Sequence, residues 1–302
     1  MIFGDVTRTS SSTEILESIR IGWPAESECP IESPNILLLT YGSCRFDVLK
    51  AARTPVLDSY AEVRKATSPA TYTYPAHLSF FVGQLPNCEE DEPYFNRFNR
   101  QLIVLAGVGE THVASDAFIQ VESDENIVGG LSQIGYQTVG AGAMSWFGLD
   151  PLTRGFERFA HTGTDADAQI DFLLAEIADD RPFFGFVNFG ETHAPFAFAG
   201  KTGRCPVDVR ARRMTWPPAP GQEPVGRESP AFDHQVQAVE FLDARLPRLF
   251  SRLRDDTIVV LTADHGECFG EGGYWGHGID HYQVRTVPLA IFRLDGAPME
   301  TR

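Results

Sequence analysis

The chain has 302 residues, a formal net charge of −16 and a pI near 4.9. Hydrophobic residues make up 43% of it, enough for a packed core, and the length allows one large domain or two small ones. Nucleic acids and anionic membrane surfaces attract basic faces, so the acidic balance argues against both as partners. An anionic substrate is compatible with this charge only where a metal ion or local cations reverse the field.

The first twenty residues, MIFGDVTRTSSSTEILESIR, are polar and carry acids early, unlike the apolar centre of a signal peptide. No apolar run approaches the ~20 residues that cross a bilayer. Five cysteines, at positions 29, 44, 88, 205 and 268, are odd in number and lack close pairing, as is typical of reduced thiols. We therefore expect a cytoplasmic protein that has no membrane partner.

Short apolar runs alternate with helical patterns along the chain. Strands are predicted at 35–40 (NILLLT), 101–107 (QLIVLAG), 136–142 (YQTVGAG), 182–189 (PFFGFVNF), 257–263 (TIVVLTA) and 286–292 (TVPLAIF). Helices are predicted at 125–135, 165–180 and 232–253, the last one bent at Pro247. The apolar stripe of the second helix is interpreted as core packing and consists of Ile170, Leu173, Leu174 and Ile177.

Strands and helices in this rhythm predict an α/β fold, a three-layer α/β/α sandwich around a mostly parallel sheet. Ligands of such sheets bind beyond the carboxyl ends of the strands. We expect an N-terminal extension at 1–33 and a single domain at 34–302. Residues 199–230, rich in Pro, Gly and Arg, are expected to form a long loop or lid. Its arginines could recognise substrate charge or simply be solvated; they are Arg204, Arg210, Arg212 and Arg213.

The strongest chemical pattern is TADHGECFGEGGYWGHGIDH, residues 262–281. Asp264 and His265 come directly after a predicted strand and offer one oxygen and one imidazole ligand, a combination that zinc and manganese accept. His277 and His281 follow within the same glycine-rich stretch and are further candidate ligands. The alternative is a glycine-rich surface loop with incidental histidines.

Two other stretches carry candidate groups. In SPATYTYPAHLSFFVGQLP, residues 68–86, Thr73 precedes a predicted helix start, where the positive end of the helix dipole favours an anion. Thr73 could be a nucleophile once a metal lowers its pKa, or only a helix cap. His193 follows the predicted strand 182–189 by a few residues. Three strand ends that each deliver a candidate group indicate an active site.

Together with PNILLLTYGSCRFDVL, these stretches resemble the sulfatase-like branch of the alkaline phosphatase superfamily, closest to a compact metalloenzyme-domain hydrolase group. The similar segments run from Pro34 to Phe292. The resemblance implies an alkaline-phosphatase-like fold in which Thr73 is the nucleophile and forms a covalent ester that water releases. It also implies that His193 and His277 contact the substrate oxygens or protonate the leaving group. The candidate metal ligands are Asp264, His265, Thr73, His277 and His281.

The sequence departs from that family in three places. Gly42 stands where the family has an acidic metal ligand, and glycine has no side chain with which to bind a metal. Thr73 cannot be converted to formylglycine, the sulfatase nucleophile, which favours phosphate over sulfate esters. His77 stands where sulfatases carry arginine. Cys44, close to Gly42, could supply a soft ligand or be a small buried hydrophobe.

The sequence therefore predicts a metal-dependent hydrolase or transferase of phosphate esters, less readily of sulfate esters, with Zn²⁺ or Mn²⁺ as cofactor. A small anionic ester is the expected partner. A non-catalytic superfamily member that binds an anionic ligand or partner is the first alternative, because the Gly42 position lacks its carboxylate. A biosynthetic enzyme with repurposed metal chemistry is the second. The oligomeric state is left open.

Overall fold

The computed structural model describes residues 33–83, 126–198, 205–209 and 225–295. The predicted strand 101–107 lies outside the described residues, and so does most of the predicted loop 199–230, including Arg204, Arg210, Arg212 and Arg213. The predicted division into an extension and a single domain stays a prediction.

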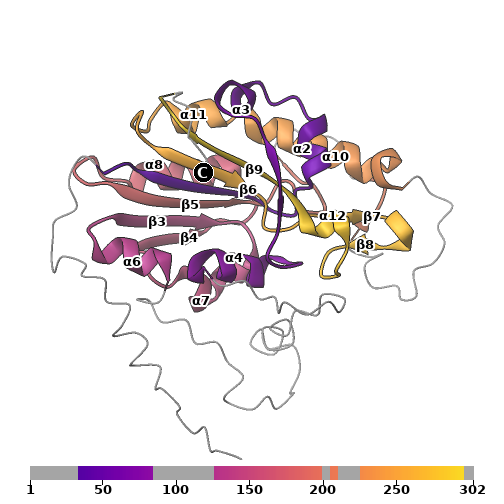
Figure 1. The fold of residues 1–302 in the computed structure, drawn as a ribbon, viewed down its shortest axis with the longest axis horizontal. Coiled ribbons are helices and arrows are strands. Elements are labelled where there is room, and N and C mark those ends of the chain that lie inside the picture. Colours follow the sequence, from indigo (N-terminus) through magenta and orange to yellow (C-terminus); the bar gives the residue numbers. More distant parts are fainter. Residues whose placement is uncertain (1–32, 84–125, 199–204, 210–224, 296–302) are drawn as a thin grey trace, which may run out of the picture.

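Seven strands of the described residues form one sheet, in the order β2-β9-β6-β1-β5-β3-β4 (Figure 1). The strands are β1 (Ile36–Tyr41), β2 (Arg64–Thr67), β3 (Gln137–Gly142), β4 (Arg158–His161), β5 (Phe183–Phe189), β6 (Ile258–Thr262) and β9 (Thr286–Arg293). Strands β6, β1, β5, β3 and β4 are parallel, whereas β9 runs antiparallel to β6 and to β2. The predicted α/β fold with a mostly parallel sheet is confirmed.

Helices cover both faces of this sheet. In Figure 1, α2, α3, α10 and α11 lie on one side and α4, α6 and α7 on the other. The helices are α2 (Phe46–Ala51), α3 (Pro55–Tyr60), α4 (Thr73–Val82), α6 (Ile127–Gln133), α7 (Asp150–Thr153), α8 (Ala166–Glu176), α10 (Pro230–Asp243), α11 (Leu246–Phe250) and α12 (Tyr282–Arg285). A small ribbon of β7 (Cys268–Phe269) and β8 (Trp275–Gly276) follows β6. None of the described helices is long and apolar enough to cross a membrane.

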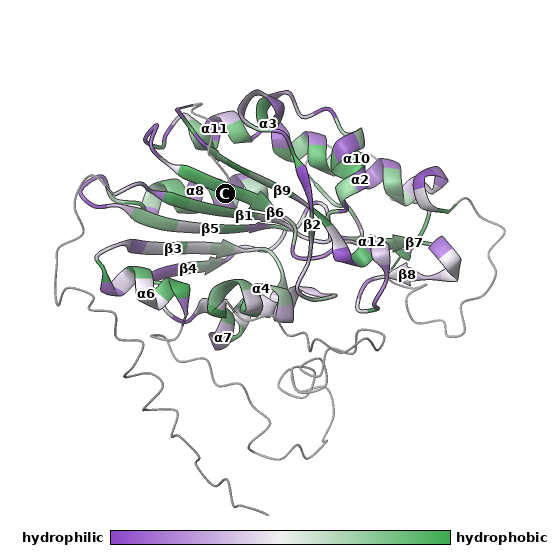
Figure 2. Cartoon of the chain, viewed as in Figure 1, coloured by the Kyte–Doolittle hydropathy of each residue, from purple (hydrophilic) through white to green (hydrophobic). Residues whose placement is uncertain are grey.

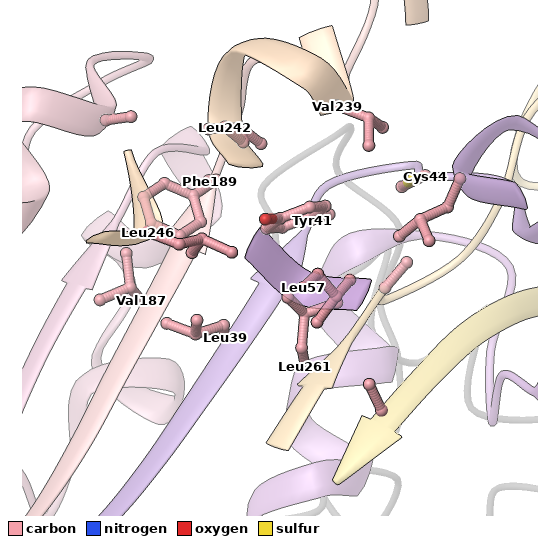
Figure 3. Packing of buried hydrophobic residues seen from close by; sticks show 14 of the residues in the cluster. Leu39, Tyr41, Cys44, Leu57, Val187, Phe189, Val239, Leu242, Leu246 and Leu261 are labelled. Carbon is pink, nitrogen blue, oxygen red and sulfur yellow. The ribbon is translucent and has the colours of Figure 1, made fainter. Parts of the chain in front are cut away.

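The period of two along the strands divides the core into two layers. On β1, Leu37, Leu39 and Tyr41 belong to the larger cluster, on the side of α2, α8, α10 and α11. Ile36 and Leu38 pack into the second cluster, on the side of α4, α6 and α7. Figure 2 shows the hydrophobic central strands, and Figure 3 the close packing of Leu39, Tyr41 and their neighbours. Thr40 therefore faces α4, which matters for the site.

Two predicted elements differ in detail from the structure. The predicted helix 232–253 is broken before Pro247 rather than at it: α10 ends at Asp243, and α11 begins with Pro247 in its first turn. A proline lacks an N–H, and the first turn of a helix is where that loss costs least. The predicted strand 286–292 forms β9, which pairs with β6 in the antiparallel direction.

Candidate active site

The strand β1 ends in a turn at Gly42 and Ser43 that reaches toward β6. Ser43 has a left-handed φ of 59°, and its backbone N–H donates to Oδ1 of Asp264 at 2.9 Å. Gly42 donates its N–H to the carbonyl of Phe189 at the end of β5. The hydroxyl of Thr192 donates to the carbonyl of Gly42. The turn is thus tied to the carboxyl ends of both neighbouring strands.

Asp264 lies immediately beyond β6 and is fully buried. Its Oδ1 accepts two backbone N–H groups, from Ser43 at 2.9 Å and from His265 at 3.0 Å. Within the described part of the chain, Oδ2 has no hydrogen-bond partner. A buried carboxylate oxygen without a donor is costly, so a partner such as a cation would account for it.

His265 is fully buried and held in one orientation. Its Nδ1 lies 2.9 Å from the carbonyl of Gly266, which can only accept, so Nδ1 carries the proton. The other nitrogen, Nε2, is then a lone-pair donor and lies 3.5 Å from Asp264 Oδ2. A backbone carbonyl on the far nitrogen is the usual support of a metal-binding histidine.

Thr73 is the first residue of α4 and is buried. Its Oγ1 lies 3.4 Å from His265 Nε2, at the end of the helix where the backbone dipole is positive. The structure therefore brings three atoms of the predicted site together: Asp264 Oδ2, His265 Nε2 and Thr73 Oγ1.

The spacing of these atoms fits a divalent cation. Ligand atoms about 2.1 Å from a zinc ion lie about 3.4 Å apart at the corners of a tetrahedron. The two measured separations, 3.5 Å between Asp264 and His265 and 3.4 Å between Thr73 and His265, agree with that value. Counting only His, Cys, Asp and Glu, no three described side chains form a group that could hold a metal ion.

Two further histidines stand beside this group. The His277 ring centroid lies 4.4 Å from that of His265 and 5.2 Å from that of His193. Glu267, buried at 1% exposure, contacts His277 Nδ1 through Oε1 at 2.8 Å. His193 Nδ1 lies 2.7 Å from the carbonyl of Ala194. His193 and His277 thus form a row of imidazoles that begins at His265.

Burial controls the charges of this group. Desolvation lowers the pKa of His265 to about 4, despite the attraction of Asp264. Desolvation and the neighbouring His277 lower the pKa of His193 to about 4. Burial alone would raise the pKa of Asp264, but His265, His77 and the Ser43 N–H together outweigh it, so this pKa lies below its usual value. At neutral pH, Asp264 is ionised and both histidines are neutral, the forms that bind a cation.

Two candidate ligands lie apart from the group. His281 caps α12, where its Nδ1 accepts the N–H of Gln283 at 3.1 Å, and its ring contacts Tyr274. It makes no hydrogen bond or ring contact with Asp264, His265 or Thr73, so the structure does not bring it to the others.

Cys44 packs in the larger hydrophobic cluster, as Figure 3 shows, and burial raises the pKa of its thiol strongly. Of the two interpretations of Cys44, a soft metal ligand or a small buried hydrophobe, the structure favours the second. A thiol binds metal as the thiolate, and burial disfavours that form.

Sequence reasoning did not single out Glu267 or the N–H of Ser43. Glu267 could have been found from its place two residues after His265, in the same glycine-rich stretch. The contact of the Ser43 N–H with Asp264 leaves no sequence signal, because it depends on a left-handed turn at a residue other than glycine.

Parts of the chain are similar to known proteins. The family model described as Sulfatase matches residues 107–287, a range that includes Asp264, His265 and His277 but neither Gly42 nor Thr73. Phosphopentomutase from Aeromonas salmonicida is 46% identical over 57 residues, which are 19% of this chain and 13% of that protein. Phosphopentomutase from Pectobacterium carotovorum is 41% identical over 66 residues, 22% of this chain and 14% of the other. The matched segment is thus only about a seventh of each mutase's length.

Several solved structures share the fold at low identity. The soluble domain of lipooligosaccharide phosphoethanolamine transferase A from Neisseria meningitidis has a TM-score of 0.54 and 17% identity, over 89% of this chain and 79% of that one. The periplasmic domain of EptC from Escherichia coli, in complex with Zn, has a TM-score of 0.54 and 12% identity, over 89% and 74%. The protein yidJ from Bacteroides fragilis, assigned as a sulfatase, has a TM-score of 0.56 and 17% identity, over 91% and 70%.

These solved structures include a phosphoethanolamine transferase, a protein assigned as a sulfatase and one domain in complex with Zn. The family match covers well over half of the 302 residues. The chain therefore belongs to the sulfatase family.

Proposed function

We propose that the protein is a metal-dependent hydrolase or transferase of small phosphate esters, with Thr73 as its nucleophile. The observation that carries this proposal is the convergence of Asp264 Oδ2, His265 Nε2 and Thr73 Oγ1 at the spacing of a divalent metal site. Sulfate esters are a less favoured substrate class, because a threonine cannot become formylglycine.

Asp264, His265 and Thr73 would hold the cation, and the neutral His265 and ionised Asp264 suit Zn²⁺ or Mn²⁺. When bound, the cation would lower the pKa of the Thr73 hydroxyl and offset negative charge on the phosphoryl oxygens. The position of Thr73 at the start of α4 adds the positive end of a helix dipole to the same point.

The residues of the chain suggest a two-step reaction. Thr73 Oγ1 attacks phosphorus, the bond from phosphorus to the leaving oxygen breaks, and phosphothreonine forms. His277 is the proposed proton carrier: Glu267 holds its Nδ1, so Nε2 can take the proton of Thr73 and pass it to the leaving oxygen. Water, or an acceptor alcohol in a transferase, then attacks the phosphothreonine and restores the hydroxyl of Thr73. His193, whose ring centroid lies 5.2 Å from that of His277, is the proposed contact of the non-bridging oxygens.

The test uses the purified full chain, stripped of metal with a chelator and reconstituted with Zn²⁺ or Mn²⁺. We expect metal-dependent turnover of an aryl phosphate monoester or diester. Thr73→Ala should lower turnover at least about a thousandfold. It should also abolish phosphorylation of the peptide that contains residue 73. Asp264→Asn should weaken metal binding.

The matched control is Ser79→Ala, which removes a hydroxyl whose one hydrogen-bond partner among the described residues is the Pro75 carbonyl on the same helix. It should keep both turnover and metal binding. If no divalent metal binds, or if Thr73→Ala turns over as well as the unaltered protein, the proposal is wrong. Binding of an anion without turnover would instead favour a non-catalytic protein. The absence of a carboxylate at Gly42 is the reason to consider that alternative.

A further inference from the structure

A chain of buried polar groups connects the sheet to the first turn of α4. Asn188 Nδ2 on β5 donates to Thr40 Oγ1 on β1 at 3.0 Å. Thr40 Oγ1 lies 3.0 Å from His77 Nε2, and His77 Nδ1 lies 2.8 Å from the carbonyl of Thr73. The side chains of Asn188, Thr40 and His77 are all at 0% exposure, and Thr73 is at 2%.

The partners fix the protonation of the imidazole. A carbonyl can only accept, so Nδ1 of His77 carries a proton and donates it to Thr73. Thr40 Oγ1 accepts from Asn188 and can give its own proton to Nε2. Both nitrogens of His77 and the Thr40 hydroxyl are satisfied when His77 is neutral and protonated at Nδ1 only, whereas Oδ1 of Asn188 has no hydrogen-bond partner among the described residues. The imidazole keeps this orientation because turning the ring would leave its nitrogens, the Thr40 hydroxyl and the Thr73 carbonyl with mismatched or unpaired groups in a buried place.

Aromatic rings enclose this imidazole. The rings of Phe80, Phe147 and Phe186 meet it edge-on, with centroids 5.6, 5.0 and 5.5 Å away. The alternation along β1 that sends Leu37 and Leu39 to the opposite layer is what turns Thr40 toward His77. The network is therefore built into the packing of the second core cluster.

The direction of the Nδ1 proton matters for Asp264. His77 Nδ1 lies 3.8 Å from Asp264 Oδ2, which is too far for a hydrogen bond. With that proton given to the Thr73 carbonyl, Asp264 Oδ2 is left available to a cation. A ring turned toward Asp264 would compete with the cation and release the Thr73 backbone.

We propose that His77 is a positioning residue, which Thr40 and Asn188 hold as the Nδ1-protonated imidazole so that it fixes Thr73 and leaves Asp264 to the metal. The inference rests on the proposed function, because it takes Thr73 and Asp264 as metal ligands. His77 itself touches neither metal nor substrate in this role.

The chain offers a matched pair of substitutions. Thr40→Val and Thr138→Val each remove, from a fully buried position on a parallel strand, a hydroxyl that has two hydrogen-bond partners. Thr138 on β3 bonds Gly155 and Glu157 and has no contact with the site. Equal losses of thermal stability are expected, because the two hydroxyls are alike in burial and bonding.

Co²⁺ is the probe for the positioning role. Thr40→Val should weaken Co²⁺ binding about tenfold, as expected when the support of a ligand is removed, and Thr138→Val should change it less than twofold. The effect of Thr40→Val on Co²⁺ binding should be smaller in a Thr73→Ala background, where only the part that acts through Asp264 remains. His77→Asn places an amide N–H where Nδ1 stood, whereas His77→Gln does not. His77→Asn should therefore retain more affinity for Co²⁺ than His77→Gln. The inference would be overturned if Thr40→Val and Thr138→Val lost the same Co²⁺ affinity. It would also be overturned if Thr40→Val weakened Co²⁺ binding as strongly in the Thr73→Ala background as in the unaltered protein.

The ring can also be observed directly. In metal-free protein, ¹⁵N spectra of the histidine side chains should show His77 protonated at Nδ1, and Thr40→Val should change that signal. A ring protonated at Nε2, or a signal that Thr40→Val leaves unaltered, refutes the inference even if no metal binds. Failure to bind Co²⁺ alone counts against the proposed function instead, so the two failures are distinguishable.

Discussion

Replacing Gly42 with aspartate tests whether the turn after β1 faces the metal position. A Cβ at Gly42 would lie 3.1 Å from the carbonyl oxygen of Phe189 and 3.8 Å from the Cβ of His193. The backbone at Gly42 is outside the left-handed region, so an L-residue fits after a shift of a few tenths of an ångström. The new carboxylate would project toward His193, on the side of the site that β5 forms.

The gain can be worked out from the ligand count. Structural zinc sites with four ligands bind with ~10–16 kcal/mol, or roughly 3 kcal/mol per ligand. The tight contact with the Phe189 carbonyl costs about 1 kcal/mol. The net gain of Gly42→Asp is then about 2 kcal/mol, which corresponds to roughly 30-fold tighter Zn²⁺ binding.

The assay is competition for Zn²⁺ against a chromophoric chelator, with Gly42→Ala and Gly42→Asn as controls. Gly42→Ala carries the steric cost alone, and Gly42→Asn adds the shape of the aspartate without its charge. Without metal, Gly42→Asp should also melt below Gly42→Ala, because its carboxylate is then buried near Asp264. Binding by Gly42→Asp no tighter than by Gly42→Ala would mean that the turn points elsewhere and that Gly42 does not occupy a ligand position.

The remaining predictions concern stability. Arg45→Met should lower the free energy of unfolding by about 3–5 kcal/mol in chemical denaturation, since it leaves Asp47 and Glu271 without the buried guanidinium that pairs with both; a loss below about 1 kcal/mol would contradict this. Metal-free protein should lose stability as pH falls from 7 to 5, because His265 and His193 have pKa values of about 4 when folded and near 6.5 when unfolded. As the pH falls, the unfolded chain binds protons before the folded one does, so each histidine lowers the free energy of unfolding by about 2 kcal/mol at pH 5. A free energy of unfolding that stays constant between pH 7 and 5 would refute this.

The layered fold could be predicted because its signals are local. The apolar runs of β1, β5 and β6 and the stripe of α8 are set by side-chain burial, which sequence periodicity reports directly. The antiparallel direction of β9 could not be predicted, because an apolar strand reads the same either way. The short edge strand β2 was missed for a related reason: its residues, RKAT, are mostly exposed and have no hydrophobic alternation.

The candidate site divides in the same way. Asp264, His265 and Thr73 could be located because each follows a strand or starts a helix, and such positions meet at one edge of the sheet. The separation of His281 from them could not be foreseen, since it depends on how the chain turns before α12. The link from Thr40 to His77 spans 37 residues and arises only when α4 packs over β1.

Two departures that the sequence resemblance predicts, at Gly42 and at His77, would have opposite effects on the charge that a bound substrate meets. An arginine at position 77 would add one positive charge, and the structure instead encloses a neutral imidazole there, bonded to Thr40 and to the Thr73 carbonyl. A carboxylate at position 42 would remove one positive charge from a divalent metal, and glycine removes none. With Asp264 as the only charged ligand among the described residues that converge, a divalent cation would keep a net charge of +1. If position 42 is a ligand position, the glycine there offsets the absence of an arginine at position 77, so an anionic ester would meet the same net charge as in a site that has both.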